Sequence, residues 1–167
     1  MTKKTLELLE LLRSQWPHPK YAFISEFRGG TGWSRDSRAD AIAMNLWPSE
    51  GLELVGFEIK TSRQDWLKEL KQPDKCNPIK QFCDRWYLVT DEEYKVANLE
   101  EIPEDWGFMH KVYDYSEKSD YTVKIKKESP KLKPKPIDKL FIASLMRLAS
   151  DPFNEIIING RSYTASN

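Results

Sequence analysis

Two stretches near the middle of the chain alternate apolar and polar residues with a period of two. They span residues 38–46 and 52–60, and Pro48 and Gly51 lie in the short connection between them. Alternation of this kind is typical of strands with one face on a core, and Pro and Gly between two such runs indicate a turn. The pattern therefore predicts a β-hairpin at the centre of the chain.

The register of this hairpin follows from its apolar positions. If Leu46 lies opposite Leu52, the apolar residues of one face are grouped together. The remaining opposed pairs are then Met44 with Leu54, Ile42 with Gly56, and Asp40 with Glu58. This register predicts that Asp40, Glu58 and Lys60 cluster at the open end of one face.

The rest of the chain carries shorter patterns of helix and strand type. Helices are predicted over residues 3–16, from a cap at 61–62 to about residue 70, within 74–84, and over 137–149. Strands are predicted over 21–28, 86–90 and 106–113, with a further hairpin over 114–124 and a last strand over 155–163 with its turn at 159–160. The order αβββαβ predicts an α/β fold in which helices flank a central mixed sheet.

Two of these helices have predicted buried stripes. In the first helix, residues at helical spacing form the stripe Leu6, Leu9, Leu12 and Trp16. In the second, the stripe is Trp66, Leu67 and Leu70. Both stripes are expected to pack on the sheet.

Length and composition indicate a folded domain. The chain has 167 residues, of which 40% are hydrophobic and six are Trp, which argues against disorder. No stretch approaches the ~20 apolar residues of a membrane span, and the start does not resemble a signal peptide. A cytoplasmic location is therefore expected. Cys76 and Cys83 are too few for a disulfide framework and, with His18 and His110, are wrongly spaced for zinc, so we expect reduced thiols.

Charge is unevenly distributed although the net charge is zero. Residues 124–139 contain seven Lys against Glu128 and Asp138, whereas residues 91–105 are strongly acidic. Alternating Pro and Lys over 128–136 predict an extended basic linker. We accordingly divide the chain into a core, residues 1–123, and a tail, residues 124–167, packed on the same domain.

The polar end of the central hairpin suggests metal chemistry. Carboxylates at the edge of a core cost several kcal/mol in desolvation unless they are paired or bind a cation. Oxygen ligation by Asp40 and Glu58, with the carbonyl of Ile59 as a third ligand, suits Mg²⁺ or Mn²⁺. Lys60 would then orient an attacking water or stabilise negative charge on a phosphate.

These residues also resemble a known family. Asp40 followed by Glu58-Ile59-Lys60 is similar to the D…ExK signature of the PD-(D/E)XK, or restriction-endonuclease-like, nuclease superfamily. The surrounding residues 37–40, 57–67 and 83–89 are most similar to the MmcB-like DNA-repair branch of bacteria and phages. The resemblance covers residues 21 to 112, and Ala39 stands where the superfamily name has Pro. It implies a restriction-endonuclease-like αβββαβ core and a Mg²⁺-dependent endonuclease active in DNA repair, recombination or phage DNA processing.

Accessory carboxylates are the next candidates. Glu26, at the end of the first strand, is the first choice for an additional catalytic carboxylate, and a surface ion pair with Arg28 or Arg38 is the alternative. In related nucleases an acidic residue of the first helix can join the metal site. Glu10 is such a residue, with a plain surface glutamate as the alternative.

Several basic and polar residues are candidates for DNA contacts. The candidates are Arg35 and Arg38 before the hairpin, Lys80 and Gln81 on the short helix, and Lys131, Lys133 and Lys135 in the linker. For Lys80 and Gln81 the reason is the resemblance, since a polar residue from that helix often touches the scissile phosphate in this superfamily. For all of them the alternative is an ordinary solvated surface.

We therefore expect a metal-dependent DNA endonuclease with DNA as its partner, no membrane association, and a homodimer left open. The first alternative is a DNA-binding module that keeps the fold without cleavage. The second is a protein-interaction domain in which Asp40, Glu58 and Lys60 form a structural charge cluster. Plasmid cleavage with Mg²⁺ separates the first reading from the others.

Overall fold

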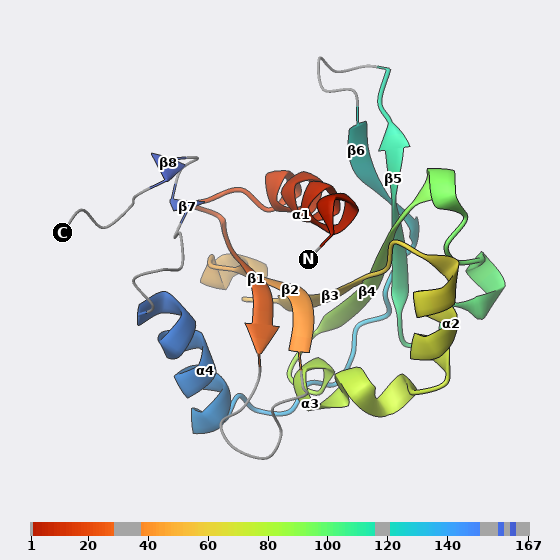
Figure 1. The fold of residues 1–167 in the computed structure, drawn as a ribbon. Coiled ribbons are helices and arrows are strands. Elements are labelled where there is room, and N and C mark those ends of the chain that lie inside the picture. Colours follow the sequence, from red (N-terminus) through yellow and green to blue (C-terminus); the bar gives the residue numbers. More distant parts are fainter. Residues whose placement is uncertain (1, 29–37, 116–120, 151–156, 159–160, 163–167) are drawn as a thin grey trace.

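The computed structural model describes residues 2–28, 38–115, 121–150, 157–158 and 161–162. Within these residues the helices are α1 (Lys3–Gln15), α2 (Arg63–Leu70), α3 (Asn77–Lys80) and α4 (Lys139–Ser150). The strands are β1 (Tyr21–Arg28), β2 (Arg38–Asn45), β3 (Leu54–Ile59), β4 (Arg85–Asp91), β5 (Gly107–Tyr113), β6 (Tyr121–Lys127), β7 (Ile157–Ile158) and β8 (Arg161–Ser162). Figure 1 shows these elements along the chain.

The first six strands form one mixed sheet in the order β1-β2-β3-β4-β5-β6. Strands β3, β4 and β5 are mutually parallel, and every other neighbouring pair is antiparallel. The predicted α/β class with a mixed sheet is confirmed. The chain also runs in the expected order of helix, three strands, helix and strand, and α3 is the short helix predicted within 74–84.

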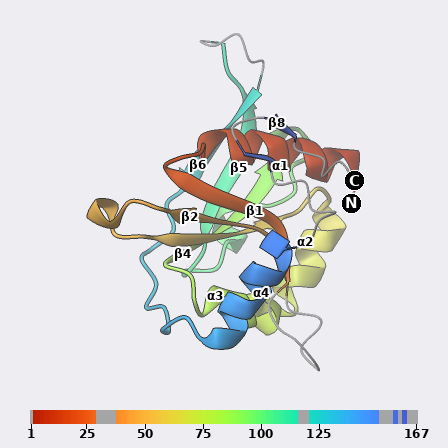
Figure 2. The ribbon, with the colours of Figure 1, turned by 90° about the vertical axis from the view of Figure 1, so that its left-hand side faces the viewer.

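Helices cover both faces of the sheet. Figure 2 shows α1 on one side of the strands and α3 and α4 on the other. Under α1, the core contains residues such as Phe57, Tyr87 and Met109. On the opposite face, Trp66 of α2, Ile79 of α3 and residues of α4 pack on the even-numbered positions of β3 and β4. Because Glu58 and Lys60 are even-numbered, they extend from the face that α2 covers.

The buried stripe of α1 differs from the predicted one. Leu8, Leu9 and Leu12 are buried, whereas Leu6 is 49% exposed. The helix therefore presents a face rotated toward Leu8, and Trp16 packs edge-on against Phe57 just beyond the last turn, with ring centroids 4.9 Å apart. Leucines on neighbouring faces are equally apolar, so the sequence does not decide which of them meets the sheet.

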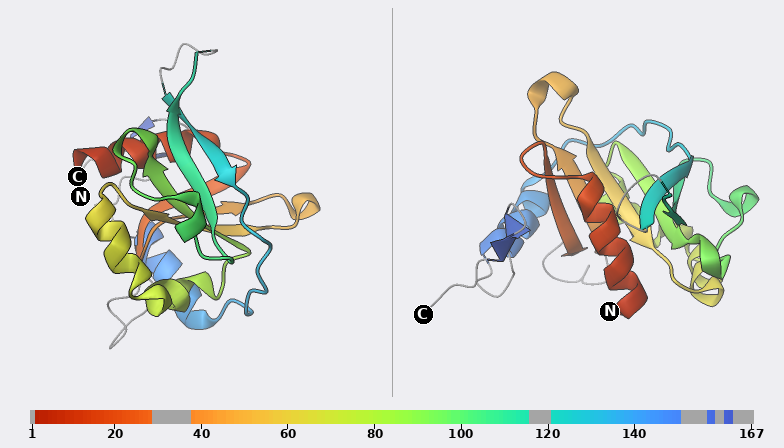
Figure 3. Two further views of the ribbon diagram at one scale, coloured as in Figure 1. Left: turned by 90° about the vertical axis from the view of Figure 1, so that its right-hand side faces the viewer. Right: turned by 90° about the horizontal axis from the view of Figure 1, so that it is seen from above.

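The central hairpin has the predicted register. Met44 pairs with Leu54 and Ile42 with Gly56. Leu46 and Leu52 themselves lie beyond the ladder and are exposed. The connection contains a short 3₁₀ turn and projects from the body of the molecule, as Figure 3 shows, at the end of the hairpin away from Asp40.

A close contact fixes β3 against β4. Gly56 lies beneath the indole of Trp86, and a Cβ added at this glycine would come within 2.2 Å of the ring. Gly56 is therefore required by its neighbour, because any larger side chain would force the two strands apart. This contact sits two residue pairs before Glu58, so it also helps to place the end of β3.

The basic segment after β6, for which an extended linker was predicted, packs on the core. The Ser129 hydroxyl accepts a hydrogen bond from the Trp86 amide at 3.2 Å, and the Leu132 amide donates to the Asp84 carbonyl at 2.8 Å. The segment has no regular secondary structure but follows the end of the sheet as a strap, which we call the 128–136 strap. Residue 124 lies inside β6, so the chain continues without a break across the division we placed at 123–124.

The end of the described chain also differs from the prediction of a single last strand. β7 and β8 pair with each other as a two-stranded antiparallel sheet, and the turn predicted at 159–160 lies outside the described residues. Cys76 and Cys83 are buried and form no disulfide, as expected for reduced thiols. In the part of the chain that the structure describes, no helix is both long and apolar enough to cross a bilayer.

Candidate active site at the end of the β2–β3 hairpin

Asp40 and Glu58 meet at the open end of the hairpin. The β2–β3 ladder ends at the pair of Ala41 with Phe57, one step before the two acids. At the next step a side chain takes the place of the backbone acceptor: Asp40 Oδ2 accepts a hydrogen bond of 2.7 Å from the amide of Ile59. The charge of Asp40 acts on the pKa of Glu58, so the two carboxylates lie near one another at this end of the hairpin.

The carbonyl of Ile59 points toward the same place. In a strand, the N–H and C=O groups of one residue project to the same neighbouring strand. The Ile59 amide donates to Asp40, whereas the Lys60 amide donates to the Val89 carbonyl on β4 at 3.0 Å. The Ile59 carbonyl therefore lies on the β2 side of β3, as the proposed third-ligand position requires.

Both carboxylates are held at an electrostatic cost. Burial, and then the charge of Asp40, raises the pKa of Glu58 to about 7. Burial also raises the pKa of Asp40, although the Ile59 amide and the charge of Lys60 act in the opposite direction. Glu58 is only 7% exposed. A buried acid whose ionised form is disfavoured by burial and by a neighbouring carboxylate is typical of functional sites.

Lys60 leans back over Glu58 and carries the positive charge of the site. Its Nζ forms an ion pair with Glu58 and a second one, at 2.9 Å, with Glu69. Burial alone lowers the pKa of Lys60, but the charges and hydrogen bonds of Glu58 and Glu69 outweigh burial and raise it. Lys60 is therefore a fixed ammonium group at the end of the hairpin.

Glu69 is the member of this cluster that the sequence patterns missed. The predicted stripe of α2 was Trp66, Leu67 and Leu70, but Trp66 and Glu69 are buried and Leu67 is 41% exposed. Glu69 also approaches Nζ of Lys75, at 3.5 Å. The spacing of Glu69 three residues after Trp66 was the available signal, since residues i and i+3 share one helix face.

The structure places Glu26 beside the site without burying it. The pairs Ser25–Ala41 and Phe27–Ala39 flank the position at which Glu26 would oppose Asp40, and that pair is absent from the described ladder. Glu26 has φ 53°, a left-handed conformation that is uncommon for Glu. Its side chain is exposed.

The two other candidates near this end of the sheet differ in their position. Arg38 is exposed at the start of β2, and its charge acts to lower the pKa of Asp40. Glu10 is exposed on α1, which covers the opposite face of the sheet from Lys60 and Glu69. We therefore place Arg38 near the site and Glu10 away from it. Arg35 lies outside the described residues.

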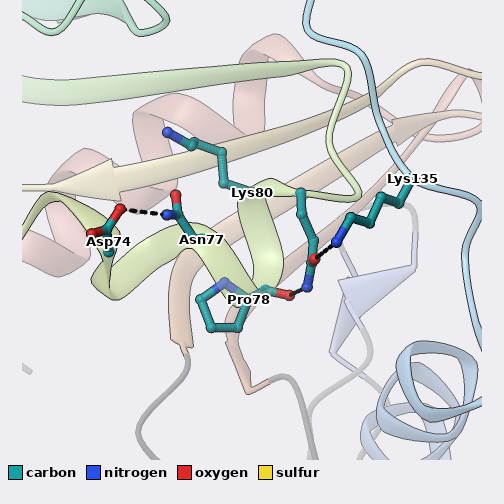
Figure 4. Close-up of a pocket in the computed structure, with 6 residues that line it drawn as sticks. Asp74, Asn77, Pro78, Lys80 and Lys135 are labelled. Atoms are coloured by element: carbon teal, nitrogen blue, oxygen red, sulfur yellow. Dashed lines mark hydrogen bonds between the residues drawn. The ribbon is translucent and has the colours of Figure 1, made fainter.

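Lys80, the last residue of α3, and Gln81, which follows it, are partly buried and engaged with protein partners. Lys80 Nζ pairs with Asp105 at 2.6 Å, and Gln81 accepts from Lys135 Nζ at 3.0 Å. Both residues line an open pocket of about 520 Å³, shown in Figure 4, in which Lys80 points away from Pro78 and Lys135. A DNA contact by either residue would have to displace or share these partners.

The lysines of the 128–136 strap are exposed but partly paired. Lys131 Nζ lies 3.3 Å from Glu53, and Lys135 also fixes its backbone to Gln81 through an amide-to-carbonyl bond of 2.7 Å. Lys133 is exposed on the strap between them. The strap thus presents positive charge on a fixed path rather than on a flexible spacer.

The donor set of the hairpin end fits a hard divalent cation. Among the described residues no group of three or more His, Cys, Asp or Glu side chains is arranged to hold a metal. Mg²⁺ does not need such a group, because it is usually held by one or two carboxylates, with water and substrate phosphates completing its shell. Asp40, Glu58 and the carbonyl of Ile59 meet this requirement, whereas zinc sites are built mainly from Cys and His.

Comparisons with known proteins support the fold. No protein-family model and no curated protein sequence matches the chain. A solved structure that matches is the SPO1766 protein of unknown function from Silicibacter pomeroyi, with 19% sequence identity and a TM-score of 0.56. The match covers 91% of this chain and 94% of that chain. At this level of identity the similarity shows that the two share a mixed α/β fold, and it carries no information on activity.

Proposed function

We propose that this protein is a divalent-cation-dependent endodeoxyribonuclease with a restriction-endonuclease-like core, which hydrolyses phosphodiester bonds in DNA. The observation that carries the proposal is the convergence of Asp40, Glu58 and Lys60 at one end of the β2–β3 hairpin. The pattern D…ExK supplies the residue types, and the register brings them together. DNA repair, recombination or phage DNA processing is the setting that the sequence resemblance favours.

Each residue has a distinct part in the proposed reaction. Asp40, Glu58 and the Ile59 carbonyl would hold Mg²⁺, which when bound supplies a water of lowered pKa and positive charge beside the phosphate. Asp40 is oriented by the Ile59 amide, so its second oxygen is left to face the cation. Lys60 holds a positive charge where negative charge develops on the phosphate oxygens.

The ion pairs of Lys60 favour the second alternative, a protein-interaction domain in which Asp40, Glu58 and Lys60 form a structural charge cluster. Two carboxylates, Glu58 and Glu69, already compensate this ammonium. Asp40 favours the nuclease. Burial raises the pKa of its carboxyl group, yet this group forms no ion pair within 4.0 Å among the described residues. A partly buried carboxylate that forms no ion pair is well suited to receive a bound cation.

Divalent cations are expected to control cleavage. Purified protein should nick or cut plasmid DNA with Mg²⁺ or Mn²⁺, and excess EDTA should abolish the activity until either ion is restored. Ca²⁺ should compete with Mg²⁺ and support little cleavage, because its looser coordination positions water poorly. Under each of these conditions, the conversion of supercoiled plasmid to nicked and linear forms is measured on agarose gels. Undiminished cleavage in excess EDTA would overturn the proposed function.

The 128–136 strap should contribute to DNA affinity through salt-dependent contacts. Changing Lys131, Lys133 and Lys135 together to Ala should flatten the dependence of log K on log salt by up to about three units, at roughly 0.9 per phosphate contact on duplex DNA. Fluorescence anisotropy over a salt series measures the slope. The matched control changes Lys3 and Lys4, exposed on α1, and should leave the slope unchanged. Equal slopes for the parent and the strap variant would mean that these lysines are only solvated.

A further inference from the structure

The ammonium of Lys60 is shared between two carboxylates that come from different elements. Glu58 lies on β3, two residues before Lys60, whereas Glu69 lies on α2. Lys60 Nζ contacts both, and its distance to Glu69 Oε2 is 2.9 Å. Glu69 is 7% exposed, so it is as deeply buried as Glu58.

A cation on Asp40 and Glu58 changes what Lys60 can contact. The Glu58 carboxylate cannot hold both an ammonium and a divalent ion in close contact, because the two cations repel each other at short range. Glu69 is the second carboxylate within reach of Nζ, and it lies on the side of Lys60 supplied by α2 rather than by the hairpin. It can keep the ammonium in place while Glu58 turns to the ion.

We propose that Glu69 is the positioning residue for Lys60, which holds the ammonium beside the site once Glu58 is engaged by a divalent cation. The inference rests on the proposed function for the identity of the site. Glu69 acts through Lys60 and is neither a ligand of the ion nor a group that touches DNA. This assigns a role to a buried acid that the D…ExK pattern leaves out.

The helix that carries Glu69 is fixed well enough for this task. The Ser62 hydroxyl caps α2 by accepting from the Asp65 amide at 3.2 Å. Trp66 is buried and donates through Nε1 to Glu101 at 3.3 Å, and Arg63 forms a two-pronged ion pair with the same Glu101. A carboxylate on an anchored helix is preorganised, which is what a positioning role requires.

Binding of Mn²⁺ to the DNA-free protein distinguishes positioning from ligation. Glu69→Gln should weaken Mn²⁺ binding by about 10- to 100-fold, the range seen when groups behind a metal site are removed, because Lys60 then competes for Glu58. In a Lys60→Ala background, Glu69→Gln should change Mn²⁺ affinity by less than about twofold, since the competing ammonium is gone. Titration calorimetry measures all four proteins. An equal loss in both backgrounds would make Glu69 a ligand and overturn the inference.

Single-turnover cleavage provides a second double-mutant cycle with the same variants. Glu69→Gln should slow cleavage by at least about tenfold at saturating Mg²⁺, and adding it to Lys60→Ala should cost less than about twofold more. Glu69→Asp, which keeps the charge on a shorter arm, should recover part of the rate. Losses that multiply in the double variant would show that Glu69 acts independently of Lys60, contrary to the inference.

Matched variants separate positioning from folding. Glu101→Gln breaks the ion pair that anchors Arg63 of α2 and leaves Lys60 untouched. Lys75→Ala removes the more exposed of the two lysines that contact Glu69. Both should keep Mn²⁺ affinity and cleavage near the parental values, even where the melting temperature falls. If Glu101→Gln reproduces the Mn²⁺ defect, Glu69 matters only through α2 stability and the inference fails. If the parent binds Mn²⁺ but cuts no DNA, the proposed nuclease fails while the Mn²⁺ cycle still decides the role of Glu69.

Discussion

Asp40→Asn and Glu58→Gln should each lower single-turnover DNA cleavage by at least about a hundredfold, because one electrostatic contact in a preorganised site is commonly worth ~3 kcal/mol of barrier. Both changes keep the shape of the side chain and remove the charge that holds the cation. Lys60→Ala should cause a loss of similar size, since it removes the charge that faces the phosphate. The rates are to be measured with excess enzyme at saturating Mg²⁺.

DNA binding should survive these three changes. Without metal, Asp40 and Glu58 repel phosphate, so neutralising either one should tighten metal-free DNA binding, whereas loss of Lys60 should weaken it slightly. A purely structural cluster leads to the opposite result, in which all three variants melt earlier and cleavage falls only as far as folding does. Variants that melt like the parent and cut DNA at the parental rate would remove this site from consideration.

The sequence was sufficient for the hairpin because each of its signals is local. Alternation from Asp40 to Met44 and from Leu54 to Glu58 allows one register that buries the apolar members, and a slip of one residue would turn them all to the other face. The structure has that register. Once the register is known, the approach of Asp40 to Glu58 follows from strand geometry alone.

Glu69 could not be found in the same way. An amphipathic reading of α2 assigns apolar residues to the buried face, so Leu67 was preferred to a glutamate. The buried position of Glu69 depends on Lys60, which belongs to another element and reaches it only after the sheet and α2 have packed. A buried charge is determined by its partner, and the partner is not visible in a helical pattern.

The 128–136 strap and Glu26 show the same limit. Pro and Lys over 128–136 indicate an extended backbone, and they carry no information about the hydrogen bonds that Ser129 and Leu132 make with Trp86 and Asp84 at the start of β4. The left-handed φ of Glu26 is equally invisible in an alternating pattern. For the strap, the deciding contacts join residues far apart in the sequence.

The stability of the metal-free protein should fall as pH rises through the window between 4.5 and about 7, the ordinary and the raised pKa of Glu58. In that window the folded protein keeps a proton on Glu58 that the unfolded chain has released, so the folded state binds more protons and loses stability with rising pH. The expected decrease is roughly 3 kcal/mol at 1.36 kcal/mol per pKa unit. The lowered pKa of His110 acts in the opposite direction, so the informative quantity is the difference between parent and variant.

Glu58→Gln should remove this decrease, because Gln has no proton to lose. Urea unfolding of parent and variant at a series of pH values from about 5 to about 8 measures the difference in the free energy of unfolding. Glu101→Gln is the control, because the pKa of Glu101 is shifted in the opposite direction from that of Glu58. Its Arg63 ion pair lowers the pKa of Glu101 to about 2, so its contribution is lost only as pH falls below 4.5, and its curve should stay parallel to the parent above about pH 5.

Mg²⁺ should reverse the trend for the parent alone, since the cation binds the ionised carboxylates and so stabilises the folded state most at high pH. At about pH 8 the parent should gain stability with saturating Mg²⁺, while Glu58→Gln should gain little. Parallel curves for the parent and Glu58→Gln across the whole pH range would contradict the buried position of Glu58 beside Asp40, and with it the reason that this end of the hairpin should take up a cation.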